Sequence, residues 1–581
     1  MKARRTNTRV ELDPPPTSTE KDSPISKSEP DDPFPRQMLL FILLMAVSVI
    51  FRLALVLYSK KYLQSDEALV GVITLDIMHG QPIPIFPYGN VYAGGHIIEA
   101  LAAIPLFKIF GPSDAALTMV SAMIGCMNLA AIYGLVYRFI NKRSALIAVF
   151  LLSFSPPFLA SNFFVNGGMT TSLLGWLGIG FFFEYCFDTG SATIRRYVAM
   201  TLSGIALGLA YYGFDYALFY LAGVLLLWSL RAGLRLWKEW RAGLLFVAGF
   251  SIGASPLIYF NLRHNFINFT SLFSRGAARS TSFPRRFFGF FTHDLPASFS
   301  VDIYDFPPKI SLVSYLGYLL FGIAFLYALW LSLPEVIRLA RAIRVGETDL
   351  LPRRPPIICI FPFLLVFFVF YTASHVGGAA TRYLLPLNPF LLVILAWSCT
   401  WVWRRFPMVA IGFLTLFAGS QAYFMPGFIR DKSTVEWKIS VQGESIKELA
   451  NFLLDRNITC VMTPYEIKWK LMFETSRKIL CVSDVFGFDR EIESNTEVRR
   501  RVDEEHMPLA IVFDQEYKYV EVVRHFRPEA EFPLVEFFQW LKDRGIRFEK
   551  ALIGKDYVVY YNFSESFPIP AWDGSTTQAP R

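Results

Sequence analysis

The sequence predicts a polytopic α-helical membrane protein that carries a small α/β domain at its C-terminal end. Of its 581 residues, 53% are hydrophobic and only 18% are charged, a composition that excludes an ordinary soluble protein. Apolar runs recur as far as Phe424, and several reach the roughly 20 residues that a helix needs to cross a bilayer. Beyond Phe424, short apolar stretches alternate with amphipathic helical patterns, which is typical of an α/β domain.

The N-terminal segment and the first apolar run indicate on which side of the membrane the N-terminus lies. Residues 1–36 are rich in proline, serine, threonine and charge, which predicts a disordered tail. Residues 37–58 form an apolar run that is too long and begins too late for a cleaved signal peptide, so we interpret it as a signal anchor. Basic residues precede this run, and the positive-inside rule therefore places the tail in the cytoplasm.

The apolar run at residues 92–111 decides the topology. If it crosses the membrane, Arg138, Lys142 and Arg143 fall outside and every later basic loop is inverted. If it lies at the outer surface as an interfacial or re-entrant helix, the later basic loops all become cytoplasmic, and we adopt this alternative. About eleven spans and an outer C-terminus follow. The expected spans are residues 37–58, 114–137, 144–161, 168–187, 197–212, 215–230, 242–261, 311–332, 355–373, 385–402 and 408–425.

Two adjacent carboxylates, Asp66 and Glu67, lie in the first outer loop, which covers residues 59–113. Charges beside a membrane-buried body are costly and mark candidate functional residues. Such a carboxylate can act as a general base, ligate a divalent cation, or cap the helix that follows. In the capping alternative Asp66 is the N-cap and Glu67 lies in the first turn, and spacing alone leaves all three roles open.

Cationic residues expected on the outer face of the membrane, where Asp66 and Glu67 also lie, favour an anionic substrate. Arg263 follows the seventh span, and Arg382 with Tyr383 precedes the tenth after a glycine-rich stretch. Arginine pairs with phosphate oxygens bidentately. The alternative is that each arginine only anchors a helix end at the lipid headgroups.

Aromatic and polar residues complete the set of candidate substrate contacts on this face. Tyr88 and Tyr92 lie in an aromatic turn rich in glycine and proline, and His96 follows it. Asn166 lies in the second outer turn, residues 161–167, where a simple polar turn residue is the favoured explanation. His96 and Glu99 have the i, i+3 spacing of a metal pair, but no third ligand is evident, so we expect no metal or other cofactor.

The outer C-terminal domain is expected over residues 427–581. No glycine-rich phosphate loop opens any of its helices, so nucleotide binding is not supported. Cys460 and Cys481 can pair, although two cysteines define no disulfide framework. The formal charge of +8 does not indicate nucleic acid, because lysine and arginine cluster between apolar runs. Helices are expected at residues 443–457 and 535–544, and strands at residues 458–462, 478–482, 510–513 and 555–561.

The first outer loop resembles that of GT-C glycosyltransferases, in the branch of protein O-mannosyltransferases and the lipid A aminoarabinose transferase (glycosyltransferase family 39). The similarity is carried by Phe86-Pro87-Tyr88-Gly89-Asn90-Val91-Tyr92, by Phe107-Lys108-Ile109-Phe110-Gly111, and by Thr381-Arg382-Tyr383-Leu384-Leu385-Pro386. It implies a GT-C fold for a catalytic domain at residues 37–426. It also implies a polyprenyl-phosphate sugar donor and a glycolipid, glycan or protein acceptor. A bacterial inner membrane is the implied location.

The resemblance also implies roles for individual residues. Asp66 matches the base that deprotonates the acceptor hydroxyl for inverting attack, and Glu67 matches a second acid that positions acceptor or base. Some relatives place a lysine just before the interfacial helix, where this chain has Ala93 and two glycines. We therefore assign the donor phosphate to Arg382 and then Arg263, with Tyr383 beside them.

Two other classes of function stay open at this point. A transporter or flippase of a lipid-linked sugar predicts charges within helices and repeated halves, whereas the spans are notably free of aspartate, glutamate and lysine and show no repeated halves. A non-catalytic membrane scaffold whose outer domain binds a partner predicts that Asp66 is dispensable.

Overall fold

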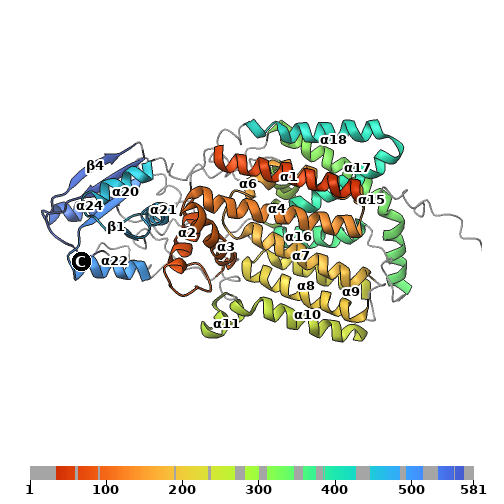
Figure 1. Cartoon of the computed structure of the whole chain (residues 1–581), viewed down its shortest axis with the longest axis horizontal. Helices are drawn as coiled ribbons and strands as arrows, with labels where there is room; N and C mark the ends of the chain where they lie inside the picture. The colour runs from red at the N-terminus through yellow and green to blue at the C-terminus, as the bar shows by residue number, and fades with distance from the viewer. Residues whose placement is uncertain are drawn as a thin grey trace, which may run out of the picture.

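A bundle of long helices and a separate sheet domain form the molecule. The computed structural model describes residues 34–58, 63–88, 92–188, 192–232, 237–268, 282–299, 311–345, 357–373, 384, 386–426, 445–483, 493–514, 534–554, 556–567 and 569. Figure 1 shows the bundle helices lying side by side along the long axis, with the sheet domain beyond one end. The bundle helices are α1 (Phe34–Tyr58), α4 (Asp114–Phe139), α5 (Lys142–Phe154), α6 (Pro156–Ser161), α7 (Gly168–Phe187), α8 (Thr193–Gly213), α9 (Ala217–Ala232), α10 (Trp240–Gly253), α11 (Ser255–Arg263), α15 (Leu312–Val345), α16 (Phe361–Ala373), α17 (Asn388–Arg405) and α18 (Pro407–Ala422).

Each expected span coincides with one of these helices or with a broken pair. Residues 144–161 divide into α5 and α6, and residues 242–261 divide into α10 and α11. Prolines occupy the first turns of α6 and α11, and a proline has no N–H with which to continue the helix before it. These two spans are therefore broken rather than continuous, which the sequence reasoning missed.

Several of these helices have the length and composition of a membrane span. Within the described part of the chain, three helices pass by length and hydropathy, namely Arg36–Tyr58, Asp114–Phe139 and Leu312–Arg338. The pair Ala217–Ala232 and Trp237–Gly253 passes together but is bent by 116°. The expectation of about eleven spans stays a prediction.

Small residues let α8 and α10 pack with their backbones in contact. Gly204 and Gly208 on α8 face the backbone of α10, and Gly249 and Gly253 on α10 face that of α8. A Cβ at any of these four positions would overlap a carbonyl oxygen of the other helix. Glycine at every fourth position allows such close approach inside a membrane, where apolar side chains alone give little preference for one partner.

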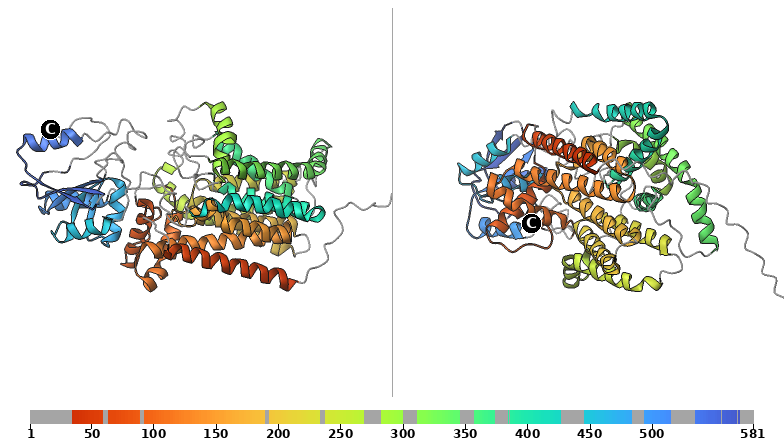
Figure 2. Two further views of the ribbon diagram at one scale, coloured as in Figure 1. Left: turned by 90° about the horizontal axis from the view of Figure 1, so that it is seen from above. Right: turned by 45° about the vertical axis from the view of Figure 1, so that its right-hand side comes forward.

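Two shorter helices, α2 (Ser65–Met78) and α3 (Gly95–Phe110), lie between the bundle and the sheet domain (Figures 1 and 2). Helix α3 is the apolar run that we expected at the outer surface. Helix α2 is buried along most of its length, with Leu69, Val72 and Ile73 fully covered. Helix α2 is thus enclosed by protein, whereas α3 leaves Ile109 and Phe110 exposed at its end.

The C-terminal domain is a mixed five-stranded sheet with helices, as the sequence predicted in outline. The strand order is β2-β1-β3-β5-β4, with β1 parallel to β2 and β3, and β5 antiparallel to β3 and β4. The expectations missed α21, α22 and β4. The elements are α20 (Ile446–Leu454), β1 (Cys460–Met462), α21 (Tyr465–Glu474), β2 (Leu480–Val482), α22 (Glu493–Asp503), β3 (Leu509–Asp514), α24 (Leu534–Asp543), β4 (Glu549–Ile553) and β5 (Tyr557–Tyr561).

Cys460 and Cys481 are both free and buried, so the pairing alternative is wrong. The two residues lie on adjacent parallel strands, but Cys460 is opposite Leu480 and Cys481 is opposite Val461. Successive side chains of a strand point to opposite faces. The two sulfurs therefore face opposite sides of the sheet.

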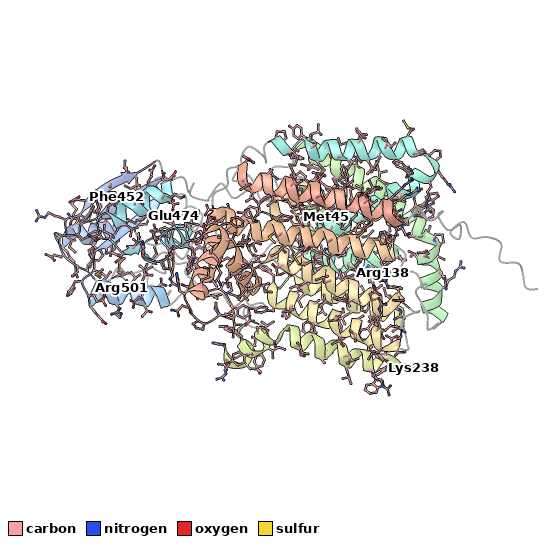
Figure 3. All side chains as sticks on the ribbon, in the orientation of Figure 1. Met45, Arg138, Lys238, Phe452, Glu474 and Arg501 are labelled. Atoms are coloured by element: carbon pink, nitrogen blue, oxygen red, sulfur yellow. The ribbon has the colours of Figure 1, made fainter. Side chains whose placement is uncertain are left out.

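Basic residues mark the end of the bundle that is farthest from the sheet domain. Figure 3 places Arg138 and Lys238 at that end. Arg138 forms ion pairs with Glu184 at the end of α7 and with Asp188 just beyond it. The distribution agrees with the expected placement of the basic loops on one side and the sheet domain on the other.

Candidate active site

Asp66 lies in the first turn of α2, and Gln64 is the N-cap of this helix. The alternative in which Asp66 caps the helix is therefore wrong. The Glu67 carboxylate closes the capping box instead, because its Oε2 accepts a hydrogen bond from the Gln64 backbone N–H at 3.1 Å. Asp66 is half-buried, and both carboxylates lie where the positive end of the helix dipole stabilises negative charge.

The C-terminal domain reaches Asp66 directly. The hydroxyl of Tyr465, the first residue of α21, donates a hydrogen bond of 2.8 Å to Asp66 Oδ1. One residue further on, the Glu466 backbone carbonyl accepts a bond of 2.7 Å from the Ser65 hydroxyl. The sequence reasoning missed Tyr465, since nothing in the chain around it indicates its distant partner.

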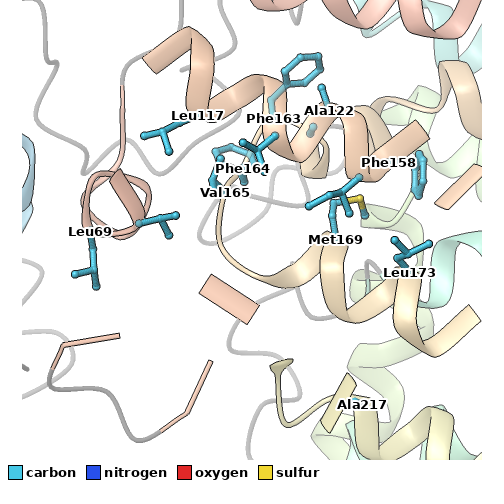
Figure 4. Packing of buried hydrophobic residues seen from close by; sticks show 14 of the residues in the cluster. Leu69, Leu117, Ala122, Phe158, Phe163, Phe164, Val165, Met169, Leu173 and Ala217 are labelled. Carbon is cyan, nitrogen blue, oxygen red and sulfur yellow. The ribbon is translucent and has the colours of Figure 1, made fainter. Parts of the chain in front are cut away.

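Two buried carboxylates hold the second outer turn against the first outer loop. Glu67 Oε1 accepts the backbone N–H of Val165 at 3.0 Å. Glu99 Oε2 accepts the N–H of Gly167 at 2.8 Å, and its Oε1 accepts the Thr170 hydroxyl at 2.9 Å. Figure 4 shows Val165 among the buried apolar side chains of this region. Glu67 thus positions the turn beside Asp66, and the metal role considered for Glu99 gives way to a structural one.

Burial raises the pKa of Glu99 to about 7, and this effect outweighs the hydrogen bonds from Gly167 and Thr170. The folded state then binds the Glu99 proton more tightly than the unfolded state, so the free energy of unfolding falls as pH rises from about 4.5 to about 7. Glu99→Gln should remove this decline. The measurement is the apparent Tm of both proteins in detergent at pH 5 and pH 8. Equal pH dependence in the two proteins contradicts the assignment.

The same turn approaches α3 at backbone distance. A Cβ on Gly95 would lie 2.7 Å from Gly167 Cα, and Gly167 itself has a positive φ of 75°. Both positions therefore require glycine, one for space and the other for its left-handed backbone. This contact places Glu99, one turn along α3, beside the Gly167 N–H.

The asparagines of the second outer turn have structural partners. Asn166 Oδ1 accepts the Gly168 N–H at 3.1 Å, as expected of a polar turn residue. Asn162 Oδ1 accepts the Nε–H of Arg52 at 3.0 Å, and Arg52 is fully buried in α1. The sequence reasoning missed Arg52, whose signal was a single guanidinium inside an apolar run.

The candidate substrate contacts divide between two places. The Tyr88 hydroxyl donates to Asp76 Oδ2 at 2.6 Å, and its ring stacks on Trp469 at the domain junction. Tyr92 packs edge-on against Phe214, and His96 Nδ1 lies 3.0 Å from a backbone carbonyl of the preceding turn. The structure therefore brings Tyr88 to α21, whereas Tyr92 lies near the end of α8.

Arg263 is exposed at the last residue of α11, and its guanidinium lies over the Tyr259 ring at 5.5 Å. The same helix contacts the aromatic turn, because Phe260 packs edge-on against Phe86 with ring centroids 4.9 Å apart. Arg382 and Tyr383 lie outside the described residues. A further cation that the sequence reasoning missed is Arg286 of α13 (Phe283–Gly289), whose Nε donates to the Thr372 carbonyl at 2.8 Å.

No group of three or more histidine, cysteine, aspartate or glutamate side chains within the described ranges could hold a metal ion.

The junction of the two domains is mainly apolar at its centre. The Phe473 ring covers Gly71 of α2 and packs against Phe107 of α3. Phe473→Ala should weaken domain docking by about 3–5 kcal/mol, the usual cost of emptying a buried phenylalanine site. Hydrogen–deuterium exchange should then rise in α2 and α21. Phe452→Ala, which removes a ring packed on Tyr561 within the C-terminal domain, is the matched control and should leave α2 protected.

The helical bundle and its C-terminal domain together have the GT-C fold. The structure superposes on ArnT from Cupriavidus metallidurans in the apo state with a TM-score of 0.59 and 12% identity, covering 90% of this chain and 98% of that one. ArnT bound to undecaprenyl phosphate gives a TM-score of 0.54 at 13% identity, with 92% and 100% covered.

An archaeal protein has a similar fold. The oligosaccharyltransferase AglB from Archaeoglobus fulgidus, in complex with an inhibitory peptide and a dolichol-phosphate, gives a TM-score of 0.50 at 12% identity, covering 87% of this chain and 72% of that one. No protein-family model matches the sequence, and no curated protein matches it. At these identities the similarity establishes the fold, which confirms the GT-C expectation. Together with the apolar helices it identifies an integral multi-pass membrane protein.

Proposed function

We propose that the protein is a glycosyltransferase that moves a sugar from a polyprenyl-phosphate donor to an acceptor hydroxyl, with Asp66 as general base. The observation that carries the proposal is the half-buried Asp66 carboxylate at the start of α2, at the junction of a GT-C bundle with its C-terminal domain. ArnT, which has this fold, has been solved with undecaprenyl phosphate bound. Such a lipid is the leaving group that the proposed reaction releases.

The reaction is a single inverting displacement. Asp66 removes the proton of the acceptor hydroxyl, and the oxygen attacks the anomeric carbon from the face opposite the phosphate. The bond between that carbon and the phosphate oxygen breaks, and its electron pair leaves with polyprenyl phosphate. A positioned general base typically contributes about 10²–10⁴-fold to such a rate.

The remaining residues take supporting roles in this proposal. Glu67 fixes the entry of α2 and the second outer turn, and so orients Asp66. Arg382, Arg263 and Tyr383 bind the donor phosphate, whose charge grows as the bond breaks. Tyr88, Tyr92, His96 and Asn166 are the proposed substrate contacts.

The proposed orientation places the reaction at the outer face of the membrane. The basic end of the bundle with Arg138 and Lys238 is then cytoplasmic, and the C-terminal domain is extracytoplasmic. In a bacterial host the membrane is the inner membrane. The acceptor is an envelope glycolipid, glycan or protein.

Deletion of the gene and complementation test the function. Mass spectrometry of envelope glycolipids and glycoproteins should show the loss of one sugar residue from one class of molecule in the deletion strain. The wild-type gene should restore it and the Asp66→Asn gene should not. Accumulation of the unmodified lipid-linked sugar at the inner face identifies a flippase, and an unchanged envelope favours a scaffold; either result overturns the proposal.

A further inference from the structure

Helix α21 of the C-terminal domain completes the surroundings of Asp66. We propose that Tyr465 is a positioning residue for the Asp66 carboxylate, so that the reaction centre requires the C-terminal domain. This inference rests on the proposed function of Asp66 as the base. It assigns part of the catalytic unit to a residue 399 positions away in the chain.

The helical period directs one face of α21 at the first outer loop. Tyr465, Trp469 and Phe473 follow one another at four-residue spacing and so share a face. Tyr465 bonds to Asp66, Trp469 stacks on Tyr88, and Phe473 covers Gly71 of α2. The face is buried, with Tyr465 3% exposed and Trp469 fully covered.

Polar contacts at both ends fix the register of α21 on α2. At the first turn, the Ser65 hydroxyl donates to the Glu466 carbonyl at 2.7 Å and to Glu466 Oε2 at 3.0 Å. Just beyond the last turn of α21, the Arg477 guanidinium pairs with Asp76, which also accepts the Tyr88 hydroxyl. Contacts at two ends and an apolar centre leave α21 little freedom to slide. The Tyr465 hydroxyl is therefore held at Asp66 by the whole junction.

A hydroxyl that donates to a carboxylate favours its ionised form and restricts its rotation. An ionised, oriented carboxylate is what a general base needs before the acceptor arrives. Loss of the Tyr465 hydroxyl should then make Asp66 easier to protonate. Other ionisable groups on the elements packed here are Glu67 and Asp76 on α2, His96, Glu99 and Lys108 on α3, and Glu466, Lys468, Lys470 and Glu474 on α21.

The test measures protonation of Asp66 without needing the acceptor. The full-length protein in lipid nanodiscs is treated with dicyclohexylcarbodiimide, which modifies protonated carboxyl groups in apolar surroundings, at a series of pH values. Peptide mass spectrometry then quantifies modification at Asp66. In Tyr465→Phe the midpoint of this modification should move to higher pH by about half a pH unit or more, because one donor to the ionised form is lost.

Arg477→Gln is the matched control, because it breaks a contact of the same junction without touching Asp66. It should leave the midpoint in place, because the Tyr465 hydroxyl and the apolar centre of the junction are retained. Tyr465→Phe keeps the ring and its packing, and an unchanged apparent Tm verifies that the domain stays folded. An unchanged midpoint in Tyr465→Phe, or equal midpoints in both variants, overturns the inference.

Complementation of the deletion strain separates this inference from the proposed function. Tyr465→Phe should restore about one tenth or less of the envelope modification that the wild type restores, given the size of a general-base contribution. If Asp66→Asn is inactive while Tyr465→Phe restores full modification, only the inference fails. If Asp66→Asn is active, the proposed base fails, whatever the labelling midpoint of Tyr465→Phe.

Discussion

Replacement of Asp66 by Asn is expected to lower the rate of sugar transfer by about 10²–10⁴-fold, the usual contribution of a general base. The amide keeps the size of the side chain and can still accept the Tyr465 hydroxyl bond, but it cannot take a proton from the acceptor. The KM for the lipid-linked donor should change little, because the donor phosphate is bound by other residues. The measurement is steady-state transfer to the acceptor class identified by the envelope analysis.

The chain offers a close control on the same helix. Asp76 also accepts a tyrosine hydroxyl and lies at the same domain junction, next to Arg477. Asp76→Asn removes the same charge from α2 and should keep transfer within a few-fold of the wild type. A comparable loss in both variants indicates that docking of the C-terminal domain, rather than proton removal, explains the effect of Asp66→Asn.

Gly95→Ala is expected to destabilise the protein by about 1–3 kcal/mol, the range found for overpacking. The new methyl group meets the Gly167 backbone, with Cα at 2.7 Å and the carbonyl oxygen at 2.9 Å. Backbone atoms cannot rotate away as a side-chain tip can, so α3 and the second outer turn must separate. The Glu99 bond to the Gly167 N–H should lengthen as a result, and transfer activity should fall with the apparent Tm.

Gly134→Ala serves as the reference for this substitution. Gly134 lies in the interior of α4, and a Cβ there meets no atom within 4 Å. Alanine favours a helix over glycine by about 0.8–1.0 kcal/mol, so this variant should be neutral or slightly stabilised. Similar melting temperatures for the two variants contradict the close contact of Gly95 with Gly167.

The sequence predicted the helices of the bundle well because each is a continuous apolar run between polar turns. The sequence prediction of continuous helices was wrong at Pro156 and Pro256, where the apolar run continues but the helix is interrupted. In the C-terminal domain, helix α21 was not predicted. Its residues Lys468 and Lys470 are buried, so its sequence has no amphipathic pattern. The Lys468 ammonium donates a hydrogen bond to Asn495 on α22, a partner that only the folded domain supplies.

The candidate site was predictable where the signal was local. Asp66 and Glu67 are adjacent carboxylates after a span, which one stretch of sequence displays. The partners of Glu67 and Glu99 in the second outer turn include the backbone N–H groups of Val165 and Gly167. Every residue carries the same backbone groups, so residue types do not indicate which N–H a carboxylate will bind, and the sequence could not predict these contacts. Nor could it predict the contact of Tyr465 with Asp66, because the two residues are far apart in the chain.

The contact between α21 and α2 also constrains how the protein is made. Asp66 and Tyr465 are 399 residues apart, and a membrane protein is inserted from its N-terminus onward. In the proposed topology the first outer loop crosses the membrane early, whereas α21 emerges only after every span has been threaded. Under the proposed function, nascent chains therefore lack the Tyr465 contact to Asp66, and the proposed reaction centre is complete only after α21 has been synthesised.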